Sequence, residues 1–393
     1  MKRIGIFVSV AFGAGGMFQY CQQLVAAMFA LPQDKFRITI FYVDEKWSSI
    51  LPSGNDSYKV NFTRKQDNFL KVLFRLRIPD VVIRWLFSLT DLKQISKSDL
   101  ALVIFPSQDL AGIFLTPRSI NVIHDLMHRY EPQFKESSGM GRGAFRDRLF
   151  GSFANSSMAM FVDSEVGKHQ MMESYGADAK KISVLPYIAP GHISKYDDSS
   201  NGEYFNKLGL SSKFLFYPAQ FWAHKNHKIL IEAAKILKNQ LPDLRIYFIG
   251  PQNHAYGEIF DSVQQNELTS QISFIDYVPN EVLGGFYLRA RAMVMPTHYG
   301  PTNIPPLEAI ALGCPVAVSN IYGMPAQLGN AALYFNNKDA RDVATVIKRL
   351  WTDDELCMSL KRNAKAHFAN WSQPQFNQKF YEMITHLLQQ EVA

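Results

Sequence analysis

The amino-terminal stretch of the chain, residues 4–30, reads IGIFVSVAFGAGGMFQYCQQLVAAMFA. It begins with a largely apolar run, Ile4–Val10, which is typical of a strand buried on both faces of a parallel sheet. Glycines follow at positions 13, 15 and 16, and then a pattern of helical period, Phe18–Ala30. The order of strand, glycine turn and helix predicts the start of a βαβ unit.

The same apolar run has a second interpretation as a secretory signal peptide. Lys2 and Arg3 precede the run, and Ala11-Phe12-Gly13 resembles a cleavage site. We favour the strand, because apolar runs followed by glycine-containing turns recur later in the chain. No uncharged apolar stretch reaches about 18 residues, so no transmembrane helix is expected.

Apolar runs of strand length alternate with helical patterns along the rest of the chain. This order predicts an α/β fold with parallel sheets. The polar, turn-rich stretch Ser194–Gly202 is the expected linker between two domains, residues 1–195 and residues 203–371, with a ligand cleft between them. The further expected strands are Arg37–Val43, Leu100–Phe105, Ser119–Ile123, Met158–Val162, Ile182–Leu185, Phe214–Tyr217, Arg245–Ile249, Ile272–Ile275, Ala292–Met295, Pro315–Ser319 and Ala332–Phe335.

The composition narrows the class of protein. The 393 residues include 41 Lys and Arg against 35 Asp and Glu, a net charge of +6, and 47% are hydrophobic. This hydrophobic content excludes a disordered chain. The basic excess is small and no nucleic-acid-binding module is recognisable, which argues against nucleic-acid binding. The three cysteines, at positions 21, 314 and 357, form no C-x-x-C pair. Neither a disulfide framework nor a zinc site is expected, and a reducing, cytoplasmic compartment is the simplest interpretation.

Two motifs in the first half have residues suited to ligand contact. The glycines of Gly13-Ala14-Gly15-Gly16 let the backbone approach a phosphate at a helix start, although a plain tight turn has the same composition. His124 follows the expected strand Ser119–Ile123, and open α/β sheets bind ligands at the carboxyl ends of their strands. His124 is therefore either a hydrogen-bonding partner for a sugar hydroxyl or a structural histidine paired with a neighbouring carboxylate.

Two loops in the second half carry the stronger signals. Residues 217–228 read YPAQFWAHKNHK and precede a helical pattern, Lys228–Asn239. Lys225 and this helix start predict a cationic phosphate site, although a solvated basic loop is the alternative. Residues 298–316 read HYGPTNIPPLEAIALGCPV, an irregular loop that leads into a helix and then a strand.

The second of these loops predicts a diphosphate site. Thr302 or Asn303 can cap the helix that starts near Pro305, and Gly313 ends it. The loop N–H groups and the positive end of the helix would then face one point. Glu308, in the first turn, can accept two hydroxyl hydrogen bonds from a ribose, or it can serve only as a partner of the helix dipole.

These four motifs, in this order, resemble the family-4 retaining glycosyltransferases of the GT-B fold, in which two Rossmann-like domains face a cleft. The resemblance covers most of the chain and is strongest from about Phe214 to Phe335. It implies that Glu308 binds the ribose, that Lys225 holds the diphosphate and that His124 lies beside the donor sugar. The other nucleotide-sugar contacts that it implies are Gly15, Gly16, Gln220, Tyr277, Val278, Gly300, Thr302, Asn303 and Ile304. It also implies that a last helix, residues 372–393, crosses back to the first domain.

Two positions depart from the pattern of this family. Gly300 stands in place of a glutamate that contacts the donor sugar, and its Gly-Pro-Thr-Asn-Ile-Pro-Pro-Leu-Glu motif is similar to that of a subset of bacterial polysaccharide transferases. Gln220 stands in place of a phosphate-binding arginine, so Lys225 carries more of the charge neutralisation. The chain has no D-x-D pair, and the resemblance implies neither a metal nor another cofactor.

The resemblance implies transfer of a sugar, with retention, from a nucleotide sugar to a hydroxyl. UDP-glucose is the expected donor, and the expected acceptor is a saccharide or lipid-linked saccharide in envelope or exopolysaccharide synthesis. One alternative is a nucleotide-sugar-binding, catalytically weak partner subunit. The other is a nucleotide-sugar 2-epimerase of the same fold, against which the Pro-Pro-Leu-Glu run argues.

Two segments of the first half have less specific patterns. Basic and apolar residues interleave between Arg64 and Trp85. This pattern indicates either peripheral contact with an anionic membrane or a helix with a solvated basic face. Residues Gly139–Phe150 are expected to form a mobile loop over the acceptor.

Overall fold

The structure, a computed structural model, describes residues 1–13, 15–51, 56–199 and 201–390. Ala14 of the glycine motif and Ser200 of the expected linker lie outside the described residues. The chain divides into two compact units. Unit 1 comprises Met1–Tyr130, Ser137–Pro186 and Gln373–Ala393, and unit 2 comprises Glu131–Glu136 and Tyr187–Ser372.

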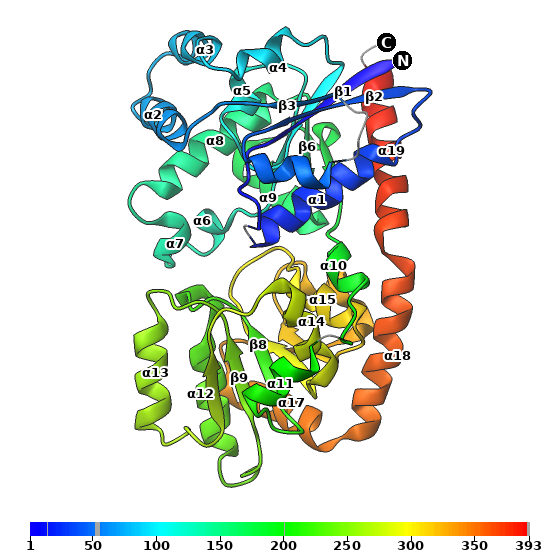
Figure 1. Ribbon diagram of the computed structural model, residues 1–393. Coiled ribbons are helices and arrows are strands. Elements are labelled where there is room, and N and C mark those ends of the chain that lie inside the picture. The colour runs from blue at the N-terminus through cyan, green and yellow to red at the C-terminus, as the bar shows by residue number, and fades with distance from the viewer. Residues whose placement is uncertain (14, 52–55, 200, 391–393) are drawn as a thin grey trace. The chain divides into compact units, whose positions relative to one another are not determined.

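Unit 1 is built on a parallel sheet of seven strands in the order β3-β2-β1-β4-β5-β6-β7 (Figure 1). Every residue of β4, β5 and β6 is buried, as expected for inner strands of a parallel sheet covered on both faces. The strands are β1 (Lys2–Val8), β2 (Phe36–Tyr42), β3 (Asp56–Lys59), β4 (Leu102–Phe105), β5 (Ser119–Ile123), β6 (Ala159–Val162) and β7 (Ile182–Val184).

Helices connect the strands of unit 1. α1 starts after a turn in which Gly13 and Gly15 have φ angles of 79° and 62°, a conformation that favours glycine. α19, from the last part of the chain, packs against α1. The helices are α1 (Gly15–Phe29), α2 (Arg64–Arg75), α3 (Asp80–Ser88), α4 (Lys93–Lys97), α5 (Ala111–Phe114), α6 (Met127–Tyr130), α8 (Arg142–Ser156), α9 (Glu165–Tyr175) and α19 (Gln373–Gln390), and α7 (Lys135–Ser138) spans the boundary with unit 2.

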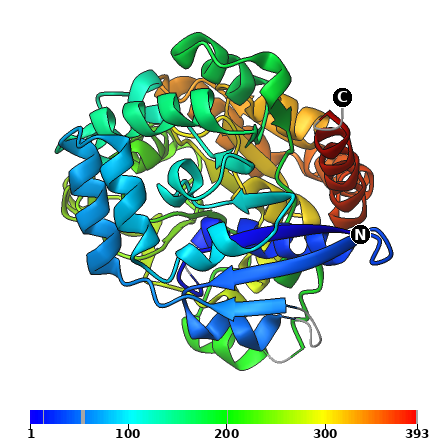
Figure 2. The same ribbon diagram turned by 90° about the horizontal axis from the view of Figure 1, so that it is seen from above.

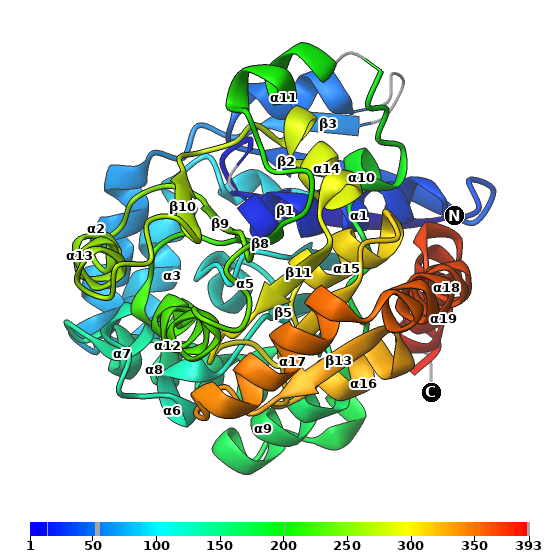
Figure 3. The same cartoon turned by 90° about the horizontal axis from the view of Figure 1, so that it is seen from below.

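Unit 2 is built on a parallel sheet of six strands in the order β10-β9-β8-β11-β12-β13 (Figure 3). The strands are β8 (Leu215–Pro218), β9 (Ile246–Ile249), β10 (Ile272–Ile275), β11 (Ala292–Met295), β12 (Val316–Ser319) and β13 (Ala332–Phe335). The helices are α10 (Gly191–Ser194), α11 (Gly202–Leu208), α12 (His227–Leu237), α13 (Tyr256–Gln265), α14 (Asn280–Arg289), α15 (Pro305–Ala311), α16 (Met324–Leu328), α17 (Ala340–Thr352) and α18 (Asp354–Asn370).

The α/β class with two parallel sheets is confirmed, and most expected strands lie close to their predicted bounds. Four of them have the bounds read from the sequence, and the others are shifted by one or two residues at an end. The first strand, Lys2–Val8, lies inside the sheet of unit 1, between β2 and β4. The four strands with unchanged bounds are Ser119–Ile123, Ile272–Ile275, Ala292–Met295 and Ala332–Phe335.

Three details differ from the sequence expectations. The mobile loop expected at Gly139–Phe150 is wrong from Arg142 onward, because α8 buries Leu149 and Phe150 against the core. The polar edge strand β3 was not expected at all. The division between the units falls at Pro186, before the polar stretch Ser194–Gly202, because α10 packs against α14 and α15 of unit 2.

In each sheet the strand order reverses at one point, between β1 and β4 in unit 1 and between β8 and β11 in unit 2. At such a point the chain leaves neighbouring strands in opposite directions, which opens space beyond their carboxyl ends. A ligand of either unit is therefore expected at the loops that follow these strands.

Candidate functional site

The loop after β8 holds Lys225 at the carboxyl edge of the unit 2 sheet. The loop turns through a short 3₁₀-helix, Ala223–Lys225, and Asn226 then begins α12 with a φ of 59°. The Tyr217 hydroxyl, on β8, donates a hydrogen bond to the Lys225 carbonyl at 3.0 Å. The Asn226 side chain donates to the Pro296 carbonyl, after β11, at 3.1 Å. These bonds fix the backbone of Lys225 and leave its ammonium group outside them.

The loop after β11 lies beside the Lys225 loop. The N–H of His298 donates to the His224 carbonyl at 2.8 Å, and the Thr297 hydroxyl donates to the same oxygen at 3.3 Å. The His224 ring stacks on Tyr299, with 3.9 Å between the ring centroids and 17° between the planes. The structure therefore brings the two loops predicted from the sequence together at the strand-order reversal of unit 2.

Lys225 is a half-buried cation. Within the part of the chain that the structure describes, no acidic side chain pairs with its ammonium group. Burial lowers the pKa of this ammonium group to about 8. A cation that has lost water without gaining a carboxylate favours an anionic ligand. The electrostatics of the loop thus suit a diphosphate.

The alternative of a solvated basic loop is wrong for most of this segment. Burial lowers the pKa of His224 to about 2 and that of His227 to about 3, so both rings are neutral at physiological pH. His227 packs among the rings of Tyr217 and Phe221. Only Lys228 fits that alternative, because it is exposed and pairs with Glu258.

Glu308 lies in the first turn of α15 and is only 3% exposed. Its Oε2 accepts a hydrogen bond from the buried Tyr287 hydroxyl at 2.6 Å. Pro305 and Pro306 form the first turn of α15, and Gly313, with a φ of 69°, follows its end, as the sequence predicts. The tyrosine therefore fixes the carboxylate in one orientation at the start of this helix.

The expected helix cap is wrong. The residue before α15 is Ile304, and neither Thr302 nor Asn303 caps the helix. The Asn303 side chain instead donates to the Tyr299 carbonyl at 2.9 Å, and its N–H donates to the Gln327 side chain at 3.0 Å. The loop is thus closed by its own polar groups and by α16.

This closure reduces the number of amides available to a ligand. The N–H groups of His298, Tyr299 and Asn303 all have partners in the protein. Among the described residues of the loop, Gly300 and Ile304 keep N–H groups without a partner. The loop therefore offers an anionic ligand fewer amides than the sequence suggests.

Gly300 has a φ of 101° and no space for a side chain. A Cβ atom there would lie 2.5 Å from the Thr302 carbonyl oxygen and 2.7 Å from Nδ2 of Asn303. The glutamate that stands at this position in the family that the chain resembles would not fit this loop. The glycine at position 300 is therefore needed for the loop to adopt this conformation.

Replacing Gly300 by alanine is expected to lower the free energy of unfolding by about 3 kcal/mol, because the clash adds to the strain of a positive φ. Urea unfolding measures the loss. Gly313→Ala is the matched control: Gly313 also has a positive φ, but its Cβ would meet nothing within 4 Å. Its expected loss is about 1 kcal/mol. Equal losses in the two variants would contradict the role given to the clash.

The other candidates of unit 2 lie on the same edge of the sheet. Gln220, after β8, is exposed, and its Oε1 accepts hydrogen bonds from Trp222 at 2.8 Å and Asn253 at 3.2 Å. Tyr277 and Val278 follow β10, and the tyrosine is 64% exposed whereas the valine is buried. Gln220 is uncharged, so it does not supply the positive charge of the arginine that stands at this position in the family that the chain resembles.

His124 lies at the carboxyl edge of the unit 1 sheet, directly after β5. Its Nε2 donates to the Pro106 carbonyl, after β4, at 2.7 Å. Burial lowers the pKa of His124, so the ring is neutral and its Nδ1 is an acceptor. The neighbouring carboxylate, Asp125, pairs with Arg146 at 2.8 Å. The His124 ring is thus held through Nε2 by a backbone carbonyl.

Two residues of unit 1 were not singled out from the sequence. The Ser9 hydroxyl, after β1, donates to Oδ1 of Asp109, after β4, at 2.7 Å. Burial raises the pKa of Asp109 to about 6, and its Oδ2 is buried without a partner among the described residues. Gly15 and Gly16, at the exposed start of α1, lie on the same edge. The strand-order reversal between β1 and β4 is the signal that would have identified this pair.

Glu136 is a further carboxylate that the sequence does not reveal. Within unit 2, its Oε1 lies 3.4 Å from Nδ1 of His224 and 3.7 Å from Nε2 of His254. It is separated from both histidines by a long stretch of chain, so only the tertiary structure brings it to the Lys225 loop.

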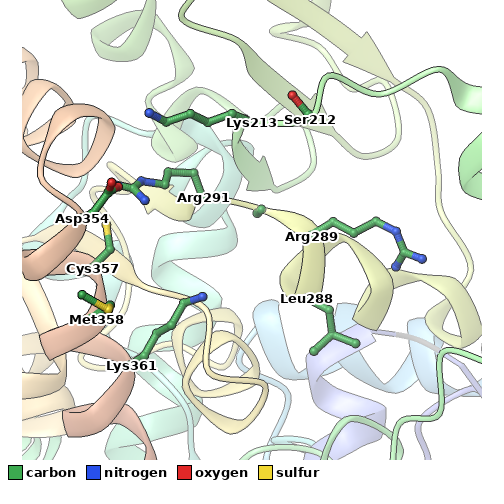
Figure 4. Close-up of a pocket in the computed structure, with 10 residues that line it drawn as sticks. Ser212, Lys213, Leu288, Arg289, Arg291, Asp354, Cys357, Met358 and Lys361 are labelled. Carbon is green, nitrogen blue, oxygen red and sulfur yellow. The ribbon is translucent and has the colours of Figure 1, made fainter.

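A separate pocket of about 580 Å³ lies near the amino ends of β8 and β11 (Figure 4). Four basic side chains line it: Lys213, Arg289, Arg291 and Lys361. The Arg291 guanidinium points to Asp354 and pairs with it at 2.6 Å, whereas Arg289 points away and pairs with Asp198 at 2.7 Å. Because this pocket lies at the edge of the sheet opposite to Lys225, it is not part of the candidate site.

Three general features bear on the chemistry. In the described part of the chain, no group of three or more His, Cys, Asp and Glu side chains is placed to hold a metal ion. None of the described helices is long and apolar enough to cross a bilayer. Cys21, Cys314 and Cys357 are free and buried.

Comparison with known proteins finds glycosyl transferases among the proteins similar to this chain. Residues 201–367 match the family described as glycosyl transferases group 1. Over 286 residues the chain is 24% identical to the serotype-specific mannosyltransferase WbdA of Escherichia coli, a match that covers 69% of this chain and 34% of WbdA. It is 28% identical over 228 residues to the O-antigen chain mannosyltransferase RfbU of Salmonella typhimurium, covering 58% of this chain and 59% of RfbU. The chain thus spans about a third of the length of WbdA.

Among solved structures, the chain is similar to Anabaena HepE in complex with UDP and glucose. The TM-score is 0.73 at 13% sequence identity, and the match covers 98% of this chain and the whole of the HepE chain. At this identity the likeness shows the fold alone. The family match includes Lys225, Glu308 and the Gly300 loop. The chain therefore has the GT-B fold, and its residues 201–367 match a group 1 glycosyl transferase domain.

Proposed function

We propose that this protein is a metal-independent, retaining hexosyltransferase. It would move a sugar from a nucleoside-diphosphate sugar to a saccharide or lipid-linked saccharide during the synthesis of an envelope polysaccharide. The observation that carries this proposal is Lys225, a half-buried cation that has no acidic partner among the described residues. It lies at the strand-order reversal of the domain that matches group 1 glycosyl transferases. The proposal places the protein in the cytoplasm.

Each unit has its own part in this reaction. In unit 2, Lys225 neutralises the charge that develops on the leaving diphosphate. The Glu308 carboxylate, oriented by Tyr287, accepts hydrogen bonds from the ribose hydroxyls. The backbone at Tyr277 and Val278 meets the base, and the Gly300 loop contacts the donor sugar and diphosphate.

In unit 1, the neutral ring of His124 presents Nδ1 as an acceptor for a hydroxyl of the donor sugar. Gly15 and Gly16 let the backbone approach the donor phosphate and the acceptor. Attack on the face from which the diphosphate leaves retains the anomeric configuration. The diphosphate takes the proton of the acceptor hydroxyl, so the protein mainly positions the reactants and stabilises charge.

Two comparisons bear on the identity of the donor sugar. The sequence resemblance favours UDP-glucose, whereas WbdA and RfbU are named mannosyltransferases. Both lines support a hexose on a nucleoside diphosphate. A panel of UDP-hexoses and GDP-hexoses, assayed for nucleotide release with and without a chelator, tests the proposal. We expect release from one donor that is unaffected by the chelator.

A nucleotide-sugar-binding partner subunit is the second candidate, because Gln220 brings no charge in place of the arginine of the resembling family. The same panel separates the two. Tight binding of a nucleoside diphosphate without turnover of any donor, even with membrane-derived lipid-linked acceptors, would favour the subunit. Turnover of one donor would exclude it.

The affinity for a nucleoside diphosphate is expected to depend on pH through Lys225. Burial lowers the pKa of free Lys225 to about 8, and a bound diphosphate raises it again because it favours the ammonium form. Affinity is therefore full below about pH 8 and falls above it, by up to about tenfold per pH unit. Calorimetry between about pH 7.5 and about pH 9.5, where phosphate is already ionised, measures this. The Lys225→Ala variant should show no such fall, and a constant affinity of the unaltered protein would contradict the assignment.

A further inference from the structure

Helices α2 and α3 of unit 1 expose an unusual number of apolar side chains. Leu76 is 67% exposed, Trp85 59% and Leu89 61%. Among the described residues, sixteen large hydrophobic side chains are exposed, and seven of them belong to these two helices and the residues next to them: Phe69, Val72, Leu76, Val81, Val82, Trp85 and Leu89. Single apolar residues on a surface need no explanation, but a concentration of this kind marks an interaction site.

The exposed side chains are not needed for the core. The opposite faces of the two helices already pack into it through Leu70 and Phe74 on α2 and Ile83 and Phe87 on α3. The helices contact each other and lie side by side at one edge of unit 1 (Figures 1 and 2). Their exposed apolar residues therefore lie on two neighbouring helices of an already complete fold.

The charges on this surface are almost all positive. Residues 64–89 contain six basic and two acidic side chains. Both acidic side chains are already neutralised, because Asp67 pairs with Lys71 at 2.6 Å and Asp80 pairs with Arg148 at 3.5 Å. Four exposed basic side chains have no acidic partner in the described part of the chain: Arg64, Lys65, Arg77 and Arg84.

We propose that this surface docks on an anionic lipid bilayer. We call it the α2–α3 face and define it by two sets of residues, the apolar Phe69, Val72, Leu76, Val81, Trp85 and Leu89 and the basic Arg64, Lys65, Arg77 and Arg84. The apolar side chains enter the boundary between headgroups and acyl chains, and the basic side chains bind lipid phosphates.

The mixture of side chains favours a lipid surface over a protein partner. The cores of protein interfaces are depleted of charged residues, whereas here unpaired cations lie among the exposed apolar residues. An indole ring and arginines with long apolar stems suit the layer between water and hydrocarbon. The proposal adds a membrane contact to the proposed function and does not depend on the chemistry of the transfer.

Vesicle flotation of the full chain tests the proposal. Vesicles of phosphatidylcholine alone are compared with vesicles that contain about 30% phosphatidylglycerol. We expect flotation with the anionic vesicles only, weakened by high salt, which screens the basic side chains. The combined charge reversal Arg64→Glu, Lys65→Glu, Arg77→Glu and Arg84→Glu should lower the partition coefficient at least about a hundredfold, because each basic residue near such a surface contributes about a factor of five.

A second variant tests the apolar part. Phe69→Ser, Leu76→Ser and Trp85→Ser together should lower the partition coefficient at least about tenfold and leave its salt dependence unchanged. Ile236→Ser with Phe260→Ser is the matched control, because these side chains are 41% and 38% exposed on unit 2. The control should float like the unaltered protein. Circular dichroism checks that each variant is folded. If a variant is not folded, the salt dependence of flotation of the unaltered protein tests the proposal in its place.

The proposal is overturned if the unaltered protein does not bind anionic vesicles, or if the charge-reversed protein floats equally well. It is also overturned if the serine variant changes only self-association, because the face would then join two copies of the chain. Transfer to a water-soluble acceptor should be the same in all these variants. If the unaltered protein floats with anionic vesicles but transfers no sugar, that result would count against the proposed function alone.

Discussion

Replacing Lys225 by alanine is expected to lower kcat about 100- to 1,000-fold. In the proposed reaction the diphosphate gains charge as it leaves, and Lys225 is a half-buried cation at the carboxyl edge of the unit 2 sheet that has no acidic partner among the described residues. Few loop amides remain to share this work, since His298, Tyr299 and Asn303 already use theirs within the protein. Steady-state kinetics with the donor found by the panel measure kcat and KM. Calorimetry with the nucleoside diphosphate measures the accompanying loss of affinity.

Lys228→Ala is the matched control for this variant. Lys228 lies on the same stretch of chain, but it is exposed and pairs with Glu258. Its kcat should stay within about twofold of the unaltered protein, since exposed ion pairs contribute little. A Lys225→Ala protein that folds normally and keeps a near-normal kcat would falsify the role given to Lys225.

Replacing Glu308 by glutamine is expected to raise the Kd for the nucleoside diphosphate about 10- to 100-fold. The variant keeps the volume of the side chain but loses the charge that strengthens the hydrogen bonds to the ribose, worth about 1.5–3 kcal/mol. Inorganic pyrophosphate, which lacks a ribose, should bind the variant as well as it binds the unaltered protein. Lys225→Ala should weaken both ligands, so the two variants separate ribose recognition from diphosphate recognition.

Tyr287→Phe shows whether the orientation of Glu308 matters. This change removes the hydroxyl that donates to Oε2 of Glu308 and should raise the Kd for the nucleotide by a smaller factor. It should leave pyrophosphate binding unchanged. If Glu308→Gln weakens pyrophosphate as much as the nucleotide, Glu308 acts only through the local field of α15, and its assignment to the ribose is wrong.

Much of the fold could be predicted because the strands of buried parallel sheets are continuous apolar runs. Ala292–Met295, which is apolar throughout, has the predicted bounds for this reason. β3 was missed because Asp56–Lys59 is polar and three of its four residues are exposed, so neither apolar content nor alternation marks it. The helix α8 was missed because two glycines, and three arginines and an aspartate among its first residues, obscure the spacing of its buried side chains.

The positions of the candidate residues could be predicted better than their partners. The sequence places Lys225, Gly300 and Glu308 after strands, and unit 2 has them on the edge predicted for a ligand. Their partners come from distant parts of the chain. Gln327 closes the loop around Asn303, and Tyr287 orients Glu308, contacts that no local pattern encodes.

In unit 1 the same limit applies to Ser9 and Asp109. They follow strands that are neighbours in the sheet but far apart in sequence, so the strand order has to be known before the pair can be recognised.

The most direct test of the account is the rate of hexose transfer from the identified donor to a lipid-linked saccharide in the presence of a chelator. We predict that the unaltered protein transfers at the same rate with and without the chelator, and that the Lys225→Ala variant is at least about 100-fold slower. Transfer that stops with the chelator and returns with a divalent cation, at a rate independent of Lys225, would contradict it.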